Sequence, residues 1–303
     1  MSTVTENQQP ITHSTLRRLV ARHPMVAFLI MAYGLGWPTL LGGHYLGMPF
    51  LLASSLLAIF GLALPAFWVT AATDGKAGVH ELLRRCFRWR VGIHWYLLAL
   101  LGLPTGTVLV ASLFLGLAPL QALVEKWPLF FTMFLPSLLI AFLLIQLFEE
   151  TGWTGFMQHT LQERHGPLLA SIVVAPFFVL IHLPLVLLET SQITIALFQV
   201  AVQAIVVIFF RVIIMWLYNG AGRSVLIVAL FHSSFNSVTG SQEAMRFIRE
   251  FAGPVALPIG LAVLAVVAVL VTVLTKGHLA YEPERAALRP AEAGRVAARP
   301  RVR

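Results

Sequence analysis

Long apolar stretches without a charged residue recur along the chain, and each has the length that a membrane-spanning helix needs. The hydrocarbon core of a bilayer, about 30 Å thick, requires roughly 20 apolar residues per helix. Between Met25 and Thr73 there is no Asp, Glu, Lys or Arg, which is enough for two spans divided at Gly42-Gly43-His44. The pattern predicts eight spans, over residues 25–42, 48–71, 95–116, 127–148, 167–188, 192–217, 224–241 and 255–275.

The polar segments between these spans divide the chain into parts. Residues 76–94 are basic and partly amphipathic, with Leu82, Leu83, Cys86 and Phe87 set against Arg84, Arg85 and Arg88, which predicts an interfacial helix. The tail is rich in Ala, Arg, Pro and Glu and is predicted to be disordered. The expected parts are a basic N-terminal segment (1–24), a first group of spans (25–128), a core (129–240), a last span (241–275) and the tail (276–303).

Composition excludes a soluble domain. The chain has 303 residues, of which 58% are hydrophobic and only 11% charged, whereas soluble domains carry about 25% charged residues. A surface that faces lipid does not need those charges. The single cysteine, Cys86, excludes an intrachain disulfide and a cysteine-based metal site.

The net charge of +8 lies mostly in a few loops and in the tail, which indicates an anionic membrane surface and not a nucleic-acid groove as the partner. If the N-terminus is cytoplasmic, seventeen Lys and Arg residues fall in cytoplasmic segments, against three (Lys126, Arg246 and Arg249) outside. The distribution predicts an all-α, polytopic transmembrane bundle of about eight spans with both termini in the cytoplasm.

Six polar residues fall inside the expected spans of the second half or directly at the end of one. They are Glu149, Glu150, His182, Arg211, His232 and Asn236. An ionisable group at mid-bilayer costs about 2.5–3.5 kcal/mol on insertion scales, so such residues turn inward, pair and often mark function. His232 and Asn236 are four residues apart and share one helix face. Adjacent Glu149 and Glu150 diverge by about 100°, so one carboxylate faces a site and the other its flank.

Two kinds of hydrolytic chemistry fit these residue types. A carboxylate and an imidazole can take a proton from water while a second imidazole and an amide stabilise an oxyanion. Alternatively, His182, His232 and a carboxylate of Glu149 or Glu150 could hold a zinc ion that acidifies bound water. Spacing leaves both open. The aromatic residues Trp153, Trp216 and Tyr218 near span ends are most simply explained as anchors at the membrane interface.

Three motifs in order resemble a known family. The chain reads Glu149-Glu150-Thr151-Gly152-Trp153-Thr154-Gly155, then Phe178-Val179-Leu180-Ile181-His182, then His232-Ser233-Ser234-Phe235-Asn236. These are similar to the Glu-Glu-x-x-x-Arg, Phe-x-x-x-His and His-x-x-x-Asn motifs of the CPBP or Abi group, the CAAX protease and bacteriocin-processing family that includes type II CAAX prenyl endoproteases. The resemblance covers residues 129–240.

The resemblance implies a role for each matching residue. Glu149 and His182 would activate water, and His232 and Asn236 would form the oxyanion hole. Glu150, Arg211, Phe178 and Trp153 would support them. The family is named as metalloproteases, and a role for zinc has been argued both ways.

One position departs from the family pattern. The Arg expected at the end of the first motif is Thr154 here, so a cation that could hold a carboxylate is missing from that helix. We hypothesise that Arg211, from the sixth expected span, supplies the charge. The missing Arg is also a reason to expect weakened activity.

The function expected from these observations is an intramembrane endopeptidase of a prokaryotic plasma membrane. Its substrate would be a membrane-tethered or lipidated peptide that reaches the site from the cytoplasmic side. An alternative is a non-catalytic, immunity-type or peptide-binding membrane protein that uses the same cavity. A proton-coupled carrier is a third class, against which stands the absence of an inverted repeat of interrupted helices in the sequence.

Overall fold

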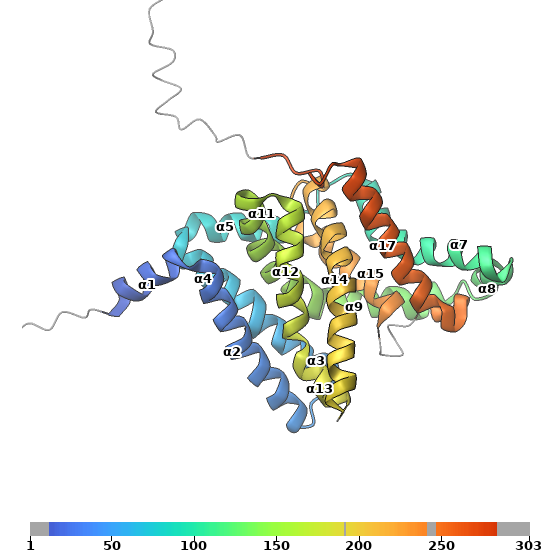
Figure 1. Ribbon diagram of the computed structural model, residues 1–303, viewed down its shortest axis with the longest axis horizontal. Coiled ribbons are helices and arrows are strands. Elements are labelled where there is room, and N and C mark those ends of the chain that lie inside the picture. Colours follow the sequence, from blue (N-terminus) through green and yellow to red (C-terminus); the bar gives the residue numbers. More distant parts are fainter. Residues whose placement is uncertain (1–11, 191, 241–246, 284–303) are drawn as a thin grey trace, which may run out of the picture.

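A computed structural model describes residues 12–190, 192–240 and 247–283 of the chain. Every regular element among these residues is a helix, which confirms the all-helical prediction (Figure 1). The expected N-terminal segment and tail lie outside the described residues over 1–11 and 284–303, as do residues 241–246 of the expected last span. Within the described part of the N-terminal segment, α1 is a helix from Thr12 to Arg22.

Seven helices and two π-helical stretches form the rest of the first half. These elements are α2 (Pro24–Tyr45), α3 (Phe50–Leu57), η1 (Ala58–Ala63), α4 (Leu64–Thr73), α5 (Gly75–Cys86), α6 (Ile93–Leu97), η2 (Leu98–Gly102), α7 (Leu103–Leu115) and α8 (Ala118–Glu125). Elements α3, η1 and α4 follow one another without a break, as do α6, η2 and α7, so each set is one long helix.

The second half contains the longest helices. From Phe130 to His165 one continuous helix comprises η3 (Phe130–Phe134), α9 (Leu135–Ala141), η4 (Phe142–Gln146), α10 (Leu147–Glu150), η5 (Thr151–Gln158) and α11 (His159–His165). It is followed by α12 (Pro167–Ile181), α13 (Leu183–Glu189), α14 (Ile193–Gly220), α15 (Val225–Thr239), α16 (Arg249–Ala252), the 3-10 turn η7 (Gly253–Val255) and α17 (Ala256–Leu274).

Six helices of the described residues are long and apolar enough to cross a membrane, and a seventh crossing results if α12 and α13 count as one bent span. The protein is therefore an integral membrane protein, but the expected count of eight is not confirmed. The remaining predicted span, 224–241, corresponds to α15, whose 15 residues extend about 22 Å, less than the thickness of the hydrocarbon core. Most of α15 is buried against other helices, so its length does not have to match the bilayer.

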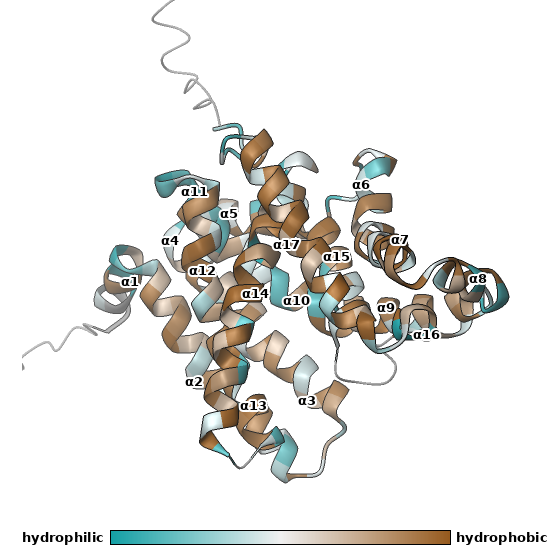
Figure 2. Ribbon diagram, turned by 45° about the vertical axis from the view of Figure 1, so that its right-hand side comes forward, coloured by the Kyte–Doolittle hydropathy of each residue, from teal (hydrophilic) through white to brown (hydrophobic). Residues whose placement is uncertain are grey.

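Hydrophobic side chains remain exposed along the outside of the long helices, as a lipid-facing surface requires. Leu113, Phe198 and Leu274 are each at least 70% exposed. Figure 2 shows apolar residues along these helices, and hydrophilic residues at their ends and around α10 in the interior.

Two boundaries differ from the prediction. Helix α2 continues through Gly42-Gly43-His44 and ends at Tyr45, because Gly43 packs closely on Ala53 and the chain turns only at Gly47, whose φ of +71° favours glycine. The predicted interfacial helix 76–94 is shorter, since α5 ends at Cys86. Its inner face also differs, because Arg85 is buried while Leu83 and Phe87 are exposed.

Close packing against α10 and η5 fixes the helix that carries the paired glutamates. Gly152 lies against the Leu62 backbone of η1, where an added Cβ would come within 3.1 Å of the Leu62 carbonyl oxygen. The glycine of the first motif therefore has a packing reason of its own, since small residues let membrane helices approach closely.

Candidate functional site

The paired glutamates lie in the middle of the bundle, on the four-residue segment α10 between two π-helical stretches. Both are buried, with Glu149 5% and Glu150 0% exposed. π-Helical turns are rare and frequent at functional sites, where they change the face to which a side chain points. The two carboxylates accordingly meet different neighbours.

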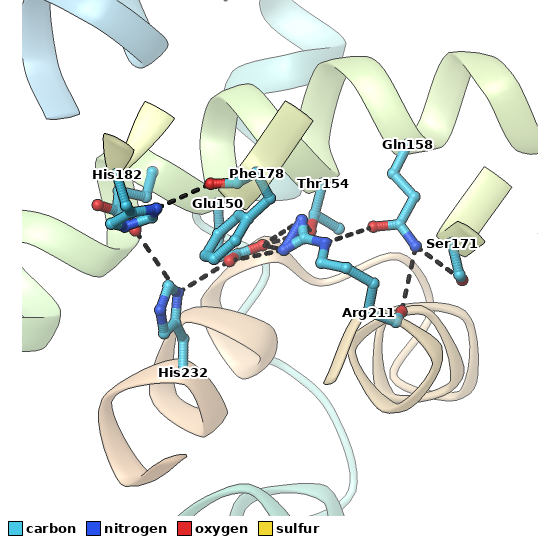
Figure 3. A network of polar contacts seen from close by, with 9 residues as sticks. Glu150, Thr154, Gln158, Ser171, Phe178, His182, Arg211 and His232 are labelled. Carbon is cyan, nitrogen blue, oxygen red and sulfur yellow. Dashed lines mark hydrogen bonds and ion pairs between the residues drawn. The ribbon is translucent and has the colours of Figure 1, made fainter. Parts of the chain in front are cut away.

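The Glu150 carboxylate is paired with the Arg211 guanidinium of α14 (Figure 3). Arg211 Nη1 lies 3.0 Å from both Glu150 oxygens, and Nη2 lies 3.3 Å from Oε2. Both side chains are completely buried. A buried carboxylate without a partner would be strongly unfavourable, so this pair is what allows Glu150 to be ionised inside the bundle.

Three further polar groups complete the surroundings of this pair. The Thr154 hydroxyl donates to Glu150 Oε2 and lies 3.2 Å from Arg211 Nη2. Gln158 accepts from Arg211 Nε at 3.1 Å and donates to the Ser171 hydroxyl at 2.9 Å and to the Arg211 carbonyl at 3.2 Å. Arg211 thus occupies the space beside Thr154, the position at which the motif has its own arginine.

Aromatic rings cover the guanidinium. Arg211 Cζ lies 5.0 Å from the ring centroid of Phe178 and 5.7 Å from that of Phe210. A cation over such a ring is attracted by the π electrons, and more so when water is absent. Phe178 therefore supports the pair through the contact of its ring with the guanidinium.

His232 of α15 connects the network to Glu149. Its Nδ1 donates to Glu150 Oε1 at 2.9 Å and lies 3.8 Å from Glu149 Oε2. Because Nδ1 carries the proton in this bond, Nε2 is the nitrogen that remains available for a ligand.

His182 lies where α12 ends, at a bend of 43° between α12 and α13. Its Nδ1 is 2.8 Å from the Phe178 carbonyl oxygen. A carbonyl can only accept, so Nδ1 is the donor and Nε2 of the neutral ring carries the free lone pair. This bond fixes the orientation in which His182 could accept a proton.

One cavity of about 390 Å³ is lined by the four residues predicted to be catalytic. Glu149, His182, His232 and Asn236 all line it, together with Phe178 and many aliphatic side chains. Glu150 and Arg211 do not line it. The cavity therefore brings together a carboxylate, two imidazoles and an amide, with the Glu150–Arg211 pair behind them.

Residues 131–238 match the family model described as type II CAAX prenyl endopeptidase, Rce1-like. The matched segment contains all three motifs and Arg211. Over this segment the chain is similar to the CAAX protease family. No curated protein matches the chain.

A zinc site formed by residues of the matched segment was one of the two expectations. Among the described residues, no group of three or more His, Cys, Asp or Glu side chains is arranged to hold a metal ion. Of the four expected ligands Glu149, Glu150, His182 and His232, Glu150 has both oxygens bonded to Arg211. These residues do not fit a metal in this arrangement.

Two aromatic residues of the matched segment are not interface anchors, which corrects the expectation for them. Trp153 is completely buried and packs on Phe28 and Phe178. Tyr218 is completely buried, and its hydroxyl lies 3.3 Å from Arg85 Nη1 and 3.1 Å from His159 Nδ1. Both rings fill the interior around the site, where packing outweighs the preference of such rings for the interface.

Sequence reasoning missed the two buried glutamines of the site. Gln158 is completely buried in the network. Gln146 is 3% exposed and lines the cavity, and its Oε1 has no hydrogen-bond partner among the described residues. The signal that would have found them is the one used for the ionisable residues, since a glutamine inside an apolar span is also costly unless it is bonded.

Proposed function

We propose that the protein is an intramembrane endopeptidase that hydrolyses a peptide bond of a membrane-associated substrate in this cavity. The observation that carries the proposal is the common cavity of Glu149, His182, His232 and Asn236. A polypeptide segment fits a largely apolar cavity that offers a few polar groups at one place.

The reaction follows from the chemistry of these groups. A water molecule held by Glu149 and His182 Nε2 gives up a proton to one of them as its oxygen attacks the carbonyl carbon. The resulting oxyanion accepts hydrogen bonds from the Asn236 amide and from His232. The C–N bond then breaks, and the departing amine takes the proton.

His232 has to be doubly protonated to donate from Nε2, because its Nδ1 proton is already directed at Glu150. The Glu150–Arg211 pair then has a positioning role, since it holds His232 toward the cavity and does not touch substrate.

Glu149→Ala and His182→Ala test the proposal. Each is expected to abolish cleavage while the protein still inserts and purifies like the wild type. The assay uses detergent-solubilised protein and internally quenched peptides in three forms: farnesylated, carrying a transmembrane segment, and unmodified. Retained turnover in both variants would reject the proposed site.

The same assay separates the rival functions. Cleavage of the farnesylated peptide alone would identify a prenylated substrate. Binding of a peptide without cleavage by the wild type, unchanged in Glu149→Ala, would favour a non-catalytic peptide-binding protein. A zinc chelator that stops cleavage, with recovery on added zinc, would establish the metal-dependent form of the reaction.

A further inference from the structure

Two buried residues in the wall of the cavity each have a polar atom without a hydrogen-bond partner among the described residues. The atoms are Gln146 Oε1 on η4 and Ser54 Oγ on α3. Both side chains are buried. A buried polar atom that is left unbonded is unfavourable, so a protein that keeps one beside a cavity gains when a ligand completes the bond.

The neighbouring serine shows that the unbonded state of Ser54 is not imposed by helix α3. Ser55 is buried as well, and its hydroxyl donates to the Leu51 carbonyl oxygen, four residues earlier, at 2.6 Å. This is the ordinary bond of a serine inside a helix. Ser54 does not form the equivalent bond, and of the two serines it is the one that lines the cavity.

Gln146 and Ser54 lie close to the groups of the proposed reaction. Gln146 precedes Glu149 by three residues on one continuous helix, so the two side chains share a face and are separated by about 4.5 Å along the axis. Elements α3 and η4 pack against each other, which places Ser54 on the neighbouring part of the wall.

The other buried polar atoms without a partner among the described residues lie away from the cavity. They belong to Trp153, Gln162, Gln199 and Asn219, none of which lines it. A missing partner alone therefore does not identify a ligand site in this protein. Gln146 and Ser54 differ from the others because their unbonded atoms belong to the cavity wall that also carries Glu149.

The chemistry of the two atoms indicates which group would complete them. A glutamine Oε1 can only accept, so its partner has to carry an N–H or O–H, while a serine hydroxyl can donate and accept. A peptide backbone offers N–H donors and C=O acceptors at close spacing. A hydrocarbon chain offers neither, and would leave both atoms unbonded.

We propose that Gln146 and Ser54 form a subsite that binds the peptide backbone of the substrate beside the scissile bond. A backbone N–H donates to Gln146 Oε1, and the Ser54 hydroxyl donates to a backbone carbonyl oxygen. An extended peptide rises about 3.3 Å per residue, so the bound groups lie one or two residues from the bond at Glu149. The subsite thereby fixes the register of the peptide. It rests on the proposed function for the word substrate, but the binding itself does not require catalysis.

A change in the peptide combined with a change in the protein tests the subsite. The quenched peptide that the wild type cleaves is prepared as a series in which an ester replaces one non-scissile amide at a time, which removes a single N–H donor. The proteins are the wild type, Gln146→Leu and Gln199→Leu. Gln199 is the matched control, because its Oε1 is also buried without a partner among the described residues but does not line the cavity. Products are identified by mass.

With the wild type, an ester at one position near the scissile bond should raise KM about two- to tenfold, the effect of one lost hydrogen bond. The same ester should have no further effect with Gln146→Leu, because the acceptor is already missing. Gln199→Leu should respond like the wild type. A series in which no ester raises KM, or in which Gln146→Leu keeps the full effect at every sensitive position, would overturn the role of Gln146.

The adjacent serines test the other half of the subsite. Ser54→Ala should raise KM in the same two- to tenfold range with kcat unchanged. Ser55→Ala is the matched control and should leave KM unchanged, since the Ser55 hydroxyl is bonded within its own helix. Equal KM values for the two variants would exclude Ser54 from the subsite.

Binding measurements separate this proposal from the proposed function. Fluorescence anisotropy with labelled forms of the farnesylated, transmembrane and unmodified peptides gives Kd for Glu149→Gln with and without Gln146→Leu. A Kd that rises with Gln146→Leu, while the wild type cleaves none of the peptides, would reject the endopeptidase alone. Cleavage by the wild type with Kd and KM insensitive to Gln146→Leu would reject the subsite alone. Neither binding nor cleavage of any peptide would reject both.

Discussion

On one side of α10, Glu150 is enclosed by Arg211, Thr154 and His232, and each of its oxygens is bonded. On the other side, the adjacent Glu149 lines a cavity of about 390 Å³. Both carboxylates are buried, so exposure does not separate them. The difference lies in their partners: a carboxylate saturated by hydrogen bonds holds structure, while one beside free space can act on a ligand.

The largest expected effect is a loss of stability when the counterion of Glu150 is removed. Arg211→Met removes the counterion and leaves Glu150 as an uncompensated buried charge, which typically costs about 3–5 kcal/mol. Arg84→Met is the matched control, because the Arg84–Glu81 pair is exposed and such pairs contribute about 1 kcal/mol or less. Thermal unfolding in detergent measures both. Equal unfolding temperatures for the two variants would show that the buried pair does not stabilise the fold.

A smaller effect is expected when the family arginine is restored. In the Arg211→Met background, Thr154→Arg supplies a cation from the helix that normally carries it, into space that the shorter Met leaves free. We expect it to recover about 1.5–3 kcal/mol of the lost stability, the range of a hydrogen bond to a charged group. The matched control is Thr154→Met in the same background. If the two double variants have the same unfolding temperature, Arg211 does not replace the motif arginine.

The smallest effect is expected on the cavity side, at Gln146. Gln146→Leu keeps the size of the side chain but removes an amide whose oxygen has no partner among the described residues. If the amide binds the substrate, KM should rise about two- to tenfold with kcat unchanged, since one hydrogen bond contributes about 0.5–1.5 kcal/mol. Stability should stay constant or increase. An unchanged KM would leave Gln146 as a packing residue.

Much of this division was predictable from the sequence. Polar side chains are unfavourable in lipid, and this criterion identified six residues that all lie at or against one cavity in the structure. They are Glu149, Glu150, His182, Arg211, His232 and Asn236. The 100° divergence of adjacent helical residues indicated that only one glutamate would face it. The π-helical stretches on both sides of α10 were not predictable, because the apolar pattern of η4 and η5 is also compatible with an α-helix.

Other features required three-dimensional packing. Hydropathy predicted a full span over residues 224–241, whereas α15 has only 15 residues. Its side chains are apolar because they pack against other helices, and hydropathy alone does not distinguish such a helix from one that faces lipid. The prediction that Trp153 and Tyr218 are interface anchors was wrong for the same reason, since both rings pack against protein. The set of residues that line the cavity depends on which helix turns are filled by side chains from elsewhere in the chain, and no local pattern carries that information.

Glu149→Gln and Glu150→Gln, measured side by side for unfolding temperature and for cleavage of the quenched peptides, test the division between the two carboxylates most directly. Glu149→Gln should unfold like the wild type and lose about 10²–10⁴-fold in kcat, the range for loss of a general base. Glu150→Gln should be the less stable protein, because Arg211 is left as an unbalanced buried charge. The opposite pattern, with a destabilised Glu149→Gln that still cleaves and a stable Glu150→Gln that does not, would contradict it.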